Sequence, residues 1–209
     1  MGQVVAEAIR FYSQRWLPSL ALGLPIALID QASQGRSLDV QTLILWAGTP
    51  LLTAAFVGAI ALTAPEPIPR RSLVTAFFCG LLVFAPVPVL VRLYVIPALA
   101  WLALFGMAVP AAALERLSPR EALRRGRQLA AADYVHALGS LCALGIVYFI
   151  ARGVLFFLLR GQADAAERAA AFLGDLVVSP ILYLGAALVY FDQAARLSLA
   201  DAGGKIRAA

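Results

Sequence analysis

Residues 73–114 read LVTAFFCGLLVFAPVPVLVRLYVIPALAWLALFGMAVPAAAL and contain one charged side chain, Arg92. A helix needs about 20 apolar residues to cross the hydrocarbon core of a bilayer, so a stretch of this length suits two crossings rather than one. Pro86 and Pro88 weaken helical structure just before Arg92, because proline lacks a backbone N–H and clashes with the preceding turn. The stretch therefore predicts a helical hairpin in a membrane that turns between Pro88 and Leu93.

The composition of the whole chain supports a membrane environment. Of its 209 residues, 62% are apolar and 14% are charged, whereas an ordinary soluble domain has about 45–50% apolar and about 25% charged residues. A chain of this size cannot bury so much apolar surface in water. These proportions argue against a water-soluble monomer and against disorder. The formal net charge of +5 then fits membrane orientation and anionic headgroups better than nucleic acid.

Four further apolar segments are expected to cross the membrane, which makes about six spans in all. The shortest, 16–29, contains Pro18 and Pro25 and is the least typical. The expected spans are 16–29, 41–64, the two halves of 73–114, 134–159 and 171–191. The predicted fold is an all-α, polytopic membrane helical bundle. Residues 1–196 form its single integral membrane domain, and 197–209 form a polar C-terminal tail.

The segment before the first span is predicted to be an amphipathic helix. Val5, Ile9, Tyr12 and Trp16 recur at helical spacing, and polar side chains fill the other side. This pattern is typical of a helix that lies in the membrane interface, where a tryptophan sits at the level of the headgroups.

Six spans place both chain ends on one side of the membrane, and the basic residues indicate which side. The segments on the side of the N-terminus hold 12 of the 17 lysines and arginines, and the loops on the other side hold four. Lysine and arginine accumulate in cytoplasmic loops. We therefore expect a cytoplasmic N-terminus and a cytoplasmic C-terminus.

A short basic helix is predicted between the hairpin and the next span. Ser118 suits the N-cap, Pro119 suits the first helical position, and Glu121 completes a capping box. We expect this amphipathic helix to lie on the inner leaflet, with arginines reaching lipid phosphates or a partner protein. The alternative is that its positive charge only determines topology. The candidate contact residues are Arg116, Arg120, Arg124, Arg125 and Arg127.

Two motifs in the second half of the chain resemble a known family. The hairpin ends Val-Pro-Ala-Ala-Ala-Leu-Glu115 and is followed by Ser118-Pro-x-Glu-Ala-Leu-x-Arg-x-x-x-Leu129. The last span ends Leu188-Val-Tyr190-Phe-Asp192-Gln-Ala-Ala-Arg196. Over about half the chain, this pattern is similar to the bacterial membrane-domain family named after the membrane portion of glycerophosphodiester phosphodiesterases.

That family commonly has a Tyr-Tyr-Asp-x-Arg ending, from which this chain departs. Phe191 replaces the second tyrosine, and Arg196 follows Asp192 by four residues instead of two. The resemblance implies a six-span helical protein of the bacterial inner membrane. No soluble segment of the given sequence is long enough for the phosphodiesterase barrel, so the resemblance does not imply its catalysis.

Three charged residues fall within or beside the expected spans, toward the outer leaflet. They are Arg92, Arg152 and Asp175, and charges at membrane depth are costly and are usually paired or functional. We expect Asp175 to pair with Arg152 or Arg92. The alternative is that each side chain extends to the outer interface. His136, three residues after Asp133, is expected to be hydrogen-bonded, and the sequence offers no second ligand that would suggest a metal site.

These features favour a non-enzymatic accessory, scaffold or lipid-interacting protein of the inner membrane, with a basic cytoplasmic platform. Its expected partners are membrane lipids with anionic headgroups or another membrane protein, and not nucleic acid. A small-solute transporter, or the substrate-binding membrane subunit of one, is the alternative, because proline-broken spans often border cavities. An intramembrane enzyme is disfavoured because paired catalytic groups are missing. No cofactor or metal is expected.

Overall fold

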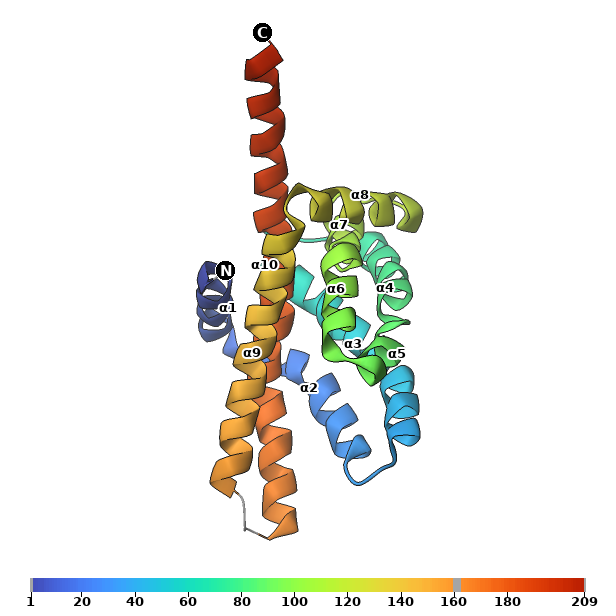
Figure 1. Cartoon of the computed structure of the whole chain (residues 1–209), viewed down its shortest axis with the longest axis vertical. Coiled ribbons are helices and arrows are strands. Elements are labelled where there is room, and N and C mark those ends of the chain that lie inside the picture. The colour runs from blue at the N-terminus through green and yellow to red at the C-terminus, as the bar shows by residue number, and fades with distance from the viewer. Residues whose placement is uncertain (1, 160–162, 209) are drawn as a thin grey trace.

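The computed structural model describes residues 2–159 and 163–208, with side chains described as far as residue 199. The regular structure in these residues is helical (Figure 1). The helices are α1 (Gly2–Gln14), α2 (Trp16–Ser33), α3 (Leu38–Thr63), α4 (Arg70–Phe84), α5 (Val87–Leu93), α6 (Val95–Phe105), α7 (Ala108–Leu114), α8 (Pro119–Ala132), α9 (Tyr134–Leu159) and α10 (Asp164–Ala208).

Five segments of the described chain are long and apolar enough to cross a membrane. They are α3, α4 with α5, α6 with α7, α9, and α10 as far as Leu199. The helix α2 has 18 residues, contains Pro25 and ends in a polar turn, and it is not among the five. The prediction of an all-α membrane bundle is confirmed, with five such segments in place of the six expected.

The predicted hairpin is present, and its turn lies at Tyr94, one residue beyond the expected interval. Tyr94 is extended, with φ −165° and ψ 158°, between the end of α5 and the start of α6. Pro86 is the N-cap of α5, and Pro88 follows within its first turn. Proline is tolerated at that place because the first N–H groups of a helix have no partner within the helix. The prolines therefore start a new helix instead of forming the turn.

The long helix α10 is the axis of the bundle. It packs against α2, α9, α1 and α3, and Figure 1 shows α9 alongside it. Within the α4–α7 hairpin, α4 packs against α3 and α6 packs against α9. The helices α2 and α10 approach closely, because a Cβ atom at Gly23 would collide with the backbone carbonyl of Leu176. The predicted tail from residue 197 continues α10, which runs to Ala208.

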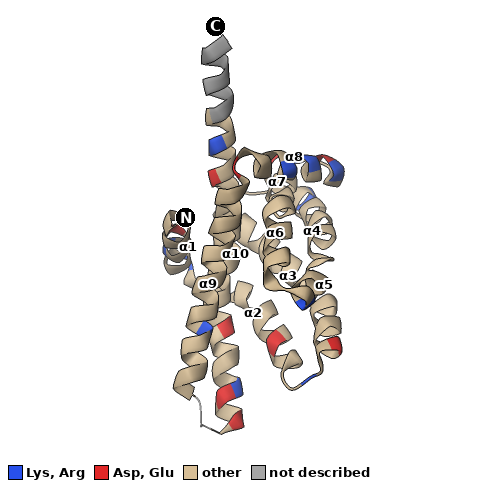
Figure 2. Ribbon diagram, viewed as in Figure 1, with Lys and Arg blue, Asp and Glu red and all other residues tan. Residues whose placement is uncertain are grey.

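The helix α8 lies across one end of the bundle, which we call the α8 end (Figure 1). The beginning of α4 is beside it, and Arg15 Nη1 of the α1–α2 junction donates a hydrogen bond to the carbonyl of Leu62, in the last turn of α3, at 3.2 Å. Figure 2 shows most of the coloured basic residues, all of them arginines, at this end. The loop between α2 and α3 lies at the opposite end.

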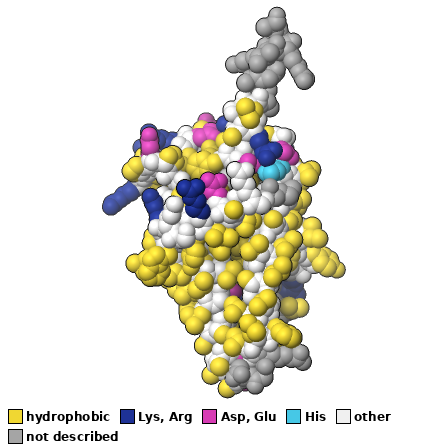
Figure 3. Space-filling model, turned by 90° about the vertical axis from the view of Figure 1, so that its left-hand side faces the viewer, with side chains coloured by type: hydrophobic (Ala, Val, Ile, Leu, Met, Phe, Trp, Pro, Cys, Tyr) yellow, Lys and Arg dark blue, Asp and Glu magenta, His cyan; other side chains and the backbone are white. Residues whose placement is uncertain are grey.

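Large apolar side chains cover the surface between the two ends. Figure 3 shows them below the charged α8 end. Trp46, Phe78, Leu82, Ile150 and Phe157 are each more than half exposed. Exposed apolar surface on this scale is typical of contact with hydrocarbon and not with water.

The amphipathic helix predicted at the N-terminus is present as α1, but its inward face differs from the expected stripe. Val4 and Ala8 are buried and Phe11 packs on the core, whereas Ile9 and Trp16 of the predicted stripe are 46% and 59% exposed. The predicted stripe is thus one residue away from the face that contacts the bundle. Burial raises the pKa of Tyr12, which also packs on the core.

Candidate functional site

The basic helix α8 begins where the sequence predicts. The backbone N–H of Ser118 donates to Glu121 Oε2 at 3.1 Å, and the Ser118 hydroxyl donates to the same oxygen at 2.6 Å. The two residues form the predicted capping box. These hydrogen bonds lower the pKa of Glu121 below its ordinary value. The start of α8 is therefore fixed by its own sequence.

One side of α8 is packed against the bundle and the other is exposed. Ala122, Gly126 and Leu129 are buried, and a Cβ atom at Gly126 would press on the backbone of Ala108 in α7. The arginines Arg116, Arg120, Arg124 and Arg127 are exposed. Four of the five predicted contact residues therefore point away from the protein at the α8 end.

Arg125 is the exception, because it is bound to the protein. Its Nε donates to both carboxylate oxygens of Glu115 at 3.0 Å, and the Tyr190 hydroxyl donates to Glu115 Oε1 at 2.7 Å. Glu115 therefore joins α8 to α10. Arg125 is better described as a structural residue than as a free contact for lipid.

A second polar cluster at the α8 end includes the lone histidine. Arg196 Nε lies 2.9 Å from Asp192 Oδ2, and Arg196 Nη1 lies 3.1 Å from Asp133 Oδ2. His136 Nε2 is 3.0 Å from Asp192 Oδ2, so the expected hydrogen bonding of His136 is present. These contacts join the α8–α9 junction to α10. Tyr190, Asp192 and Arg196, which carry part of the family resemblance, thus all take part in holding this end together.

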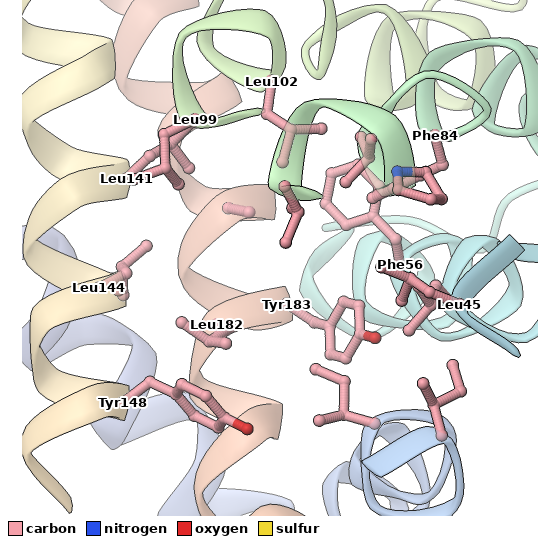
Figure 4. Close-up of a pocket in the computed structure, with 18 of the residues that line it drawn as sticks. Leu45, Phe56, Phe84, Leu99, Leu102, Leu141, Leu144, Tyr148, Leu182 and Tyr183 are labelled. Carbon is pink, nitrogen blue, oxygen red and sulfur yellow. The ribbon is translucent and has the colours of Figure 1, made fainter. Parts of the chain in front are cut away.

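The described residues line a partly open cavity of about 630 Å³ between α2, α3, α5, α6, α9 and α10. This volume is within the range of ligand pockets, about 300–1,000 Å³. Figure 4 shows that its labelled wall residues are mainly leucines and phenylalanines, with Tyr148 entering from α9 and Tyr183 from α10. The cavity is apolar along most of its wall.

Three charged residues, Asp30, Arg92 and Arg152, line this cavity. Arg152 Nη1 lies 2.7 Å from Asp175 Oδ1, and Arg152 Nη2 lies 2.7 Å from Asp30 Oδ2. The Tyr148 hydroxyl donates to Asp175 Oδ1 at 2.6 Å. The predicted pairing of Asp175 with Arg152 is therefore present. We call Asp30, Tyr148, Arg152 and Asp175 the charged cluster.

Arg92, the third predicted intramembrane charge, lies apart from the charged cluster. It pairs with Asp39 of α3 at 2.5 Å, and both side chains are substantially exposed. Arg92 therefore links the turn of the hairpin to the start of α3.

The sequence analysis predicts no partner for three groups at these sites. Asp30 directly follows the first expected span, and an acidic residue in that position indicates a partner at membrane depth. Glu115 was treated as part of a motif, without a partner. Tyr183 gave no signal, because a tyrosine in an apolar span usually packs in the core.

Among the described residues, no group of three or more His, Cys, Asp or Glu side chains could hold a metal ion. Comparison with family models, curated proteins and solved structures finds no match to this chain.

Proposed function

We propose that this chain is a non-enzymatic, lipid-interacting protein of the bacterial inner membrane, and that α8 contacts anionic lipid headgroups on the cytoplasmic side. The observation that carries the proposal is the position of α8. It lies across the end of the bundle with Arg120, Arg124 and Arg127 exposed, and Arg116, just before the helix, is exposed as well. Each basic side chain near an anionic membrane surface contributes about 1 kcal/mol of attraction.

We further propose that α2 is a sixth crossing, so that both chain ends face the cytoplasm. Two contacts support this path. Arg15, just before α2, bonds to Leu62 at the α8 end, and Asp30, near the end of α2, bonds to Arg152 in the second half of α9. Tilt and proline allow a helix with a short apolar run to pass between these points. The resemblance to the phosphodiesterase membrane-domain family stays part of this proposal.

The test compares lipid binding by matched arginine variants in mild detergent. One variant, Arg120→Gln with Arg124→Gln, loses two charges on α8. The control, Arg36→Gln with Arg168→Gln, loses two exposed charges remote from α8. Binding of short-chain phosphatidylglycerol and phosphatidylcholine is measured by native mass spectrometry.

We expect the α8 variant to bind phosphatidylglycerol up to about thirtyfold more weakly than the wild type, which corresponds to about 1 kcal/mol for each lost charge. The control should bind it like the wild type, and phosphatidylcholine binding should not change. Equal affinities of the two variants would contradict the lipid contact. A second protein that co-purifies with the wild type but not with the α8 variant would favour the scaffold role instead.

The cavity favours a second candidate, a small-solute transporter, because the charged residues Asp30, Arg92 and Arg152 lie on its wall. The apolar character of most of the wall is less suited to a polar solute. Uptake of radiolabelled polar solutes into proteoliposomes tests this candidate. Uptake that is lost in Arg152→Gln would support transport, and uptake equal to that of empty liposomes would argue against it.

A further inference from the structure

The hydroxyl of Tyr183 is a buried polar group that no protein group satisfies. Tyr183 is 7% exposed, and its Oη has no hydrogen-bond partner among the described residues. Figure 4 shows the ring projecting from α10 into the cavity, with its hydroxyl end on the side of Phe56 and Leu45. A buried donor without a partner costs about 1–3 kcal/mol, so such groups usually mark a site that something else completes.

Water alone is a poor partner for this hydroxyl. A buried water molecule typically needs two to four polar partners. The labelled side chains near Tyr183 in Figure 4, Leu45, Phe56 and Leu182, are apolar. An acceptor oxygen on a mainly apolar molecule satisfies the hydroxyl without leaving other polar groups unpaired. Such a molecule also matches the rest of the wall.

Charged side chains on the wall provide partners for the polar end of that molecule. Asp30, Arg92 and Arg152 line the cavity. Arg152 binds the carboxylates of Asp30 and Asp175, with N···O distances of 2.7 Å, and Arg92 pairs with Asp39. The polar end of a bound molecule therefore meets charged groups that already have partners.

We propose that the cavity binds a membrane molecule that has a long apolar chain and a carbonyl oxygen, and that Tyr183 donates its hydrogen bond to this carbonyl. The apolar chain lies against the leucines and phenylalanines of the wall, and the polar end faces Asp30 and Arg152. An ester carbonyl of an acyl lipid and a carbonyl of an isoprenoid quinone supply the same chemistry. This site is separate from the proposed contact at α8.

The glycines of α9 provide matched variants that test the cavity. Gly145 lines the cavity, and a Cβ atom there would meet no atom within 4 Å, so Gly145→Leu fills the space without a backbone collision. Gly153, about two turns further along α9, is equally open but exposed. Gly153→Leu therefore makes the same chemical change outside the cavity. A third variant, Tyr183→Phe, removes only the hydroxyl.

The experiment measures co-purified molecules for each variant in mild detergent. Organic extracts are analysed by mass spectrometry for ester lipids, and by absorbance and mass for quinones, which distinguishes the two sources. We expect the wild type and Gly153→Leu to retain one such molecule per chain, and Gly145→Leu to retain at least tenfold less. Tyr183→Phe should weaken rebinding about threefold to tenfold, as expected for one hydrogen bond.

The thermal stability of delipidated protein is an independent test of the hydrogen bond from Tyr183. Without a bound molecule, Tyr183→Phe should melt at a higher temperature than the wild type, because the variant lacks the unpaired hydroxyl. With the molecule bound, that order should disappear or reverse. Two results would overturn the proposal: equal retention by Gly145→Leu and Gly153→Leu, or rebinding unaffected in Tyr183→Phe. The rebinding measurement with Tyr183→Phe remains a valid test even if Gly145→Leu fails to fold.

Discussion

Arg152 Nη1 lies 2.7 Å from each carboxylate oxygen of Asp175, so a single guanidinium nitrogen joins α9 to α10 within the apolar part of the bundle. The Asp175 side chain is 1% exposed and Arg152 is 33% exposed. The other guanidinium nitrogen, Nη2, binds Asp30 of α2. The consecutive helices α9 and α10 and the distant helix α2 therefore meet at one arginine.

Replacing Asp175 with asparagine should destabilise the protein strongly. The change leaves the charge of Arg152 with only the partly exposed Asp30 as its anionic partner in the charged cluster, and breaking a buried pair typically costs about 3–5 kcal/mol. Asp39→Asn is the matched control, since it breaks the exposed pair with Arg92, which is worth about 1 kcal/mol or less. Unfolding in mixed micelles with increasing denaturant measures both. Equal losses in the two variants would show that the Arg152–Asp175 pair is not a buried one.

The crossing of α2 over α10 should depend on a glycine. A Cβ atom at Gly23 would overlap the carbonyl of Leu176, and this backbone atom cannot move aside without shifting α10. Gly23→Ala should therefore lower the melting temperature. Gly153→Ala should raise the stability by up to about 1 kcal/mol, because alanine is the better helix former and the position is open. A Gly23→Ala protein as stable as Gly153→Ala would rule out the close crossing.

Neighbouring arginines on α8 should separate stability from lipid binding. Arg125→Gln removes the contact with Glu115 and should cost about 1 kcal/mol of stability, since the pair is partly exposed. Arg124→Gln should leave stability unchanged and reduce binding of phosphatidylglycerol. Thermal melts and lipid titrations of both variants check this division. If Arg125→Gln melts like the wild type, Glu115 does not hold α8 to α10 through this residue.

The start of α8 should depend on pH in a defined direction. The Ser118 hydrogen bonds lower the pKa of Glu121 from its ordinary value of 4.5, so the ionised form stabilises the fold. This stability is present above pH 4.5 and is lost as the pH falls through the lowered pKa. In Ser118→Ala, the pKa of Glu121 should rise toward 4.5. Carbon-detected NMR titration of the Glu121 carboxyl measures it, and an unchanged pKa would remove the capping box as its cause.

The sequence predicts the helices better than their contacts. The lengths of the apolar runs and the positions of the prolines predict α3, α9 and the hairpin, because these elements depend on local composition. The 134–159 span coincides with α9, and the expected 41–64 span differs from α3 by a few residues at its start. The turn at Tyr94 differs because proline at the start of a helix costs little, and the sequence alone does not say which side of Pro88 the chain will bend.

Sites that depend on tertiary contacts were predicted in part. The pairing of Arg152 with Asp175 follows from the cost of an unpaired charge in hydrocarbon, so two such residues on adjacent spans indicate each other. The role of Arg125 could not be predicted, because Arg124 and Arg127 are chemically equivalent until α8 is placed against Glu115. The unpaired Tyr183 hydroxyl likewise depends on which helices surround it.

The inward face of α1 shows the same limit. Val5 and Val4 are equally apolar, and helical periodicity alone does not distinguish a face that contacts the protein from one that contacts lipid. In a membrane both faces can be apolar. The arrangement of α1 on α10 had to come from the structure.

The proposed topology is best tested by determining on which side of the membrane each part of the chain lies. In a background with Cys79→Ala and Cys142→Ala, single cysteines replace the exposed residues Gln3, Arg36 and Gln128. A membrane-impermeant maleimide is applied to intact spheroplasts and to inverted vesicles. We predict that positions 3 and 128 react only in inverted vesicles and that position 36 reacts only in spheroplasts. Labelling of positions 3 and 128 from opposite sides would contradict it, because α2 would then not cross and α8 would not share a face with the N-terminus.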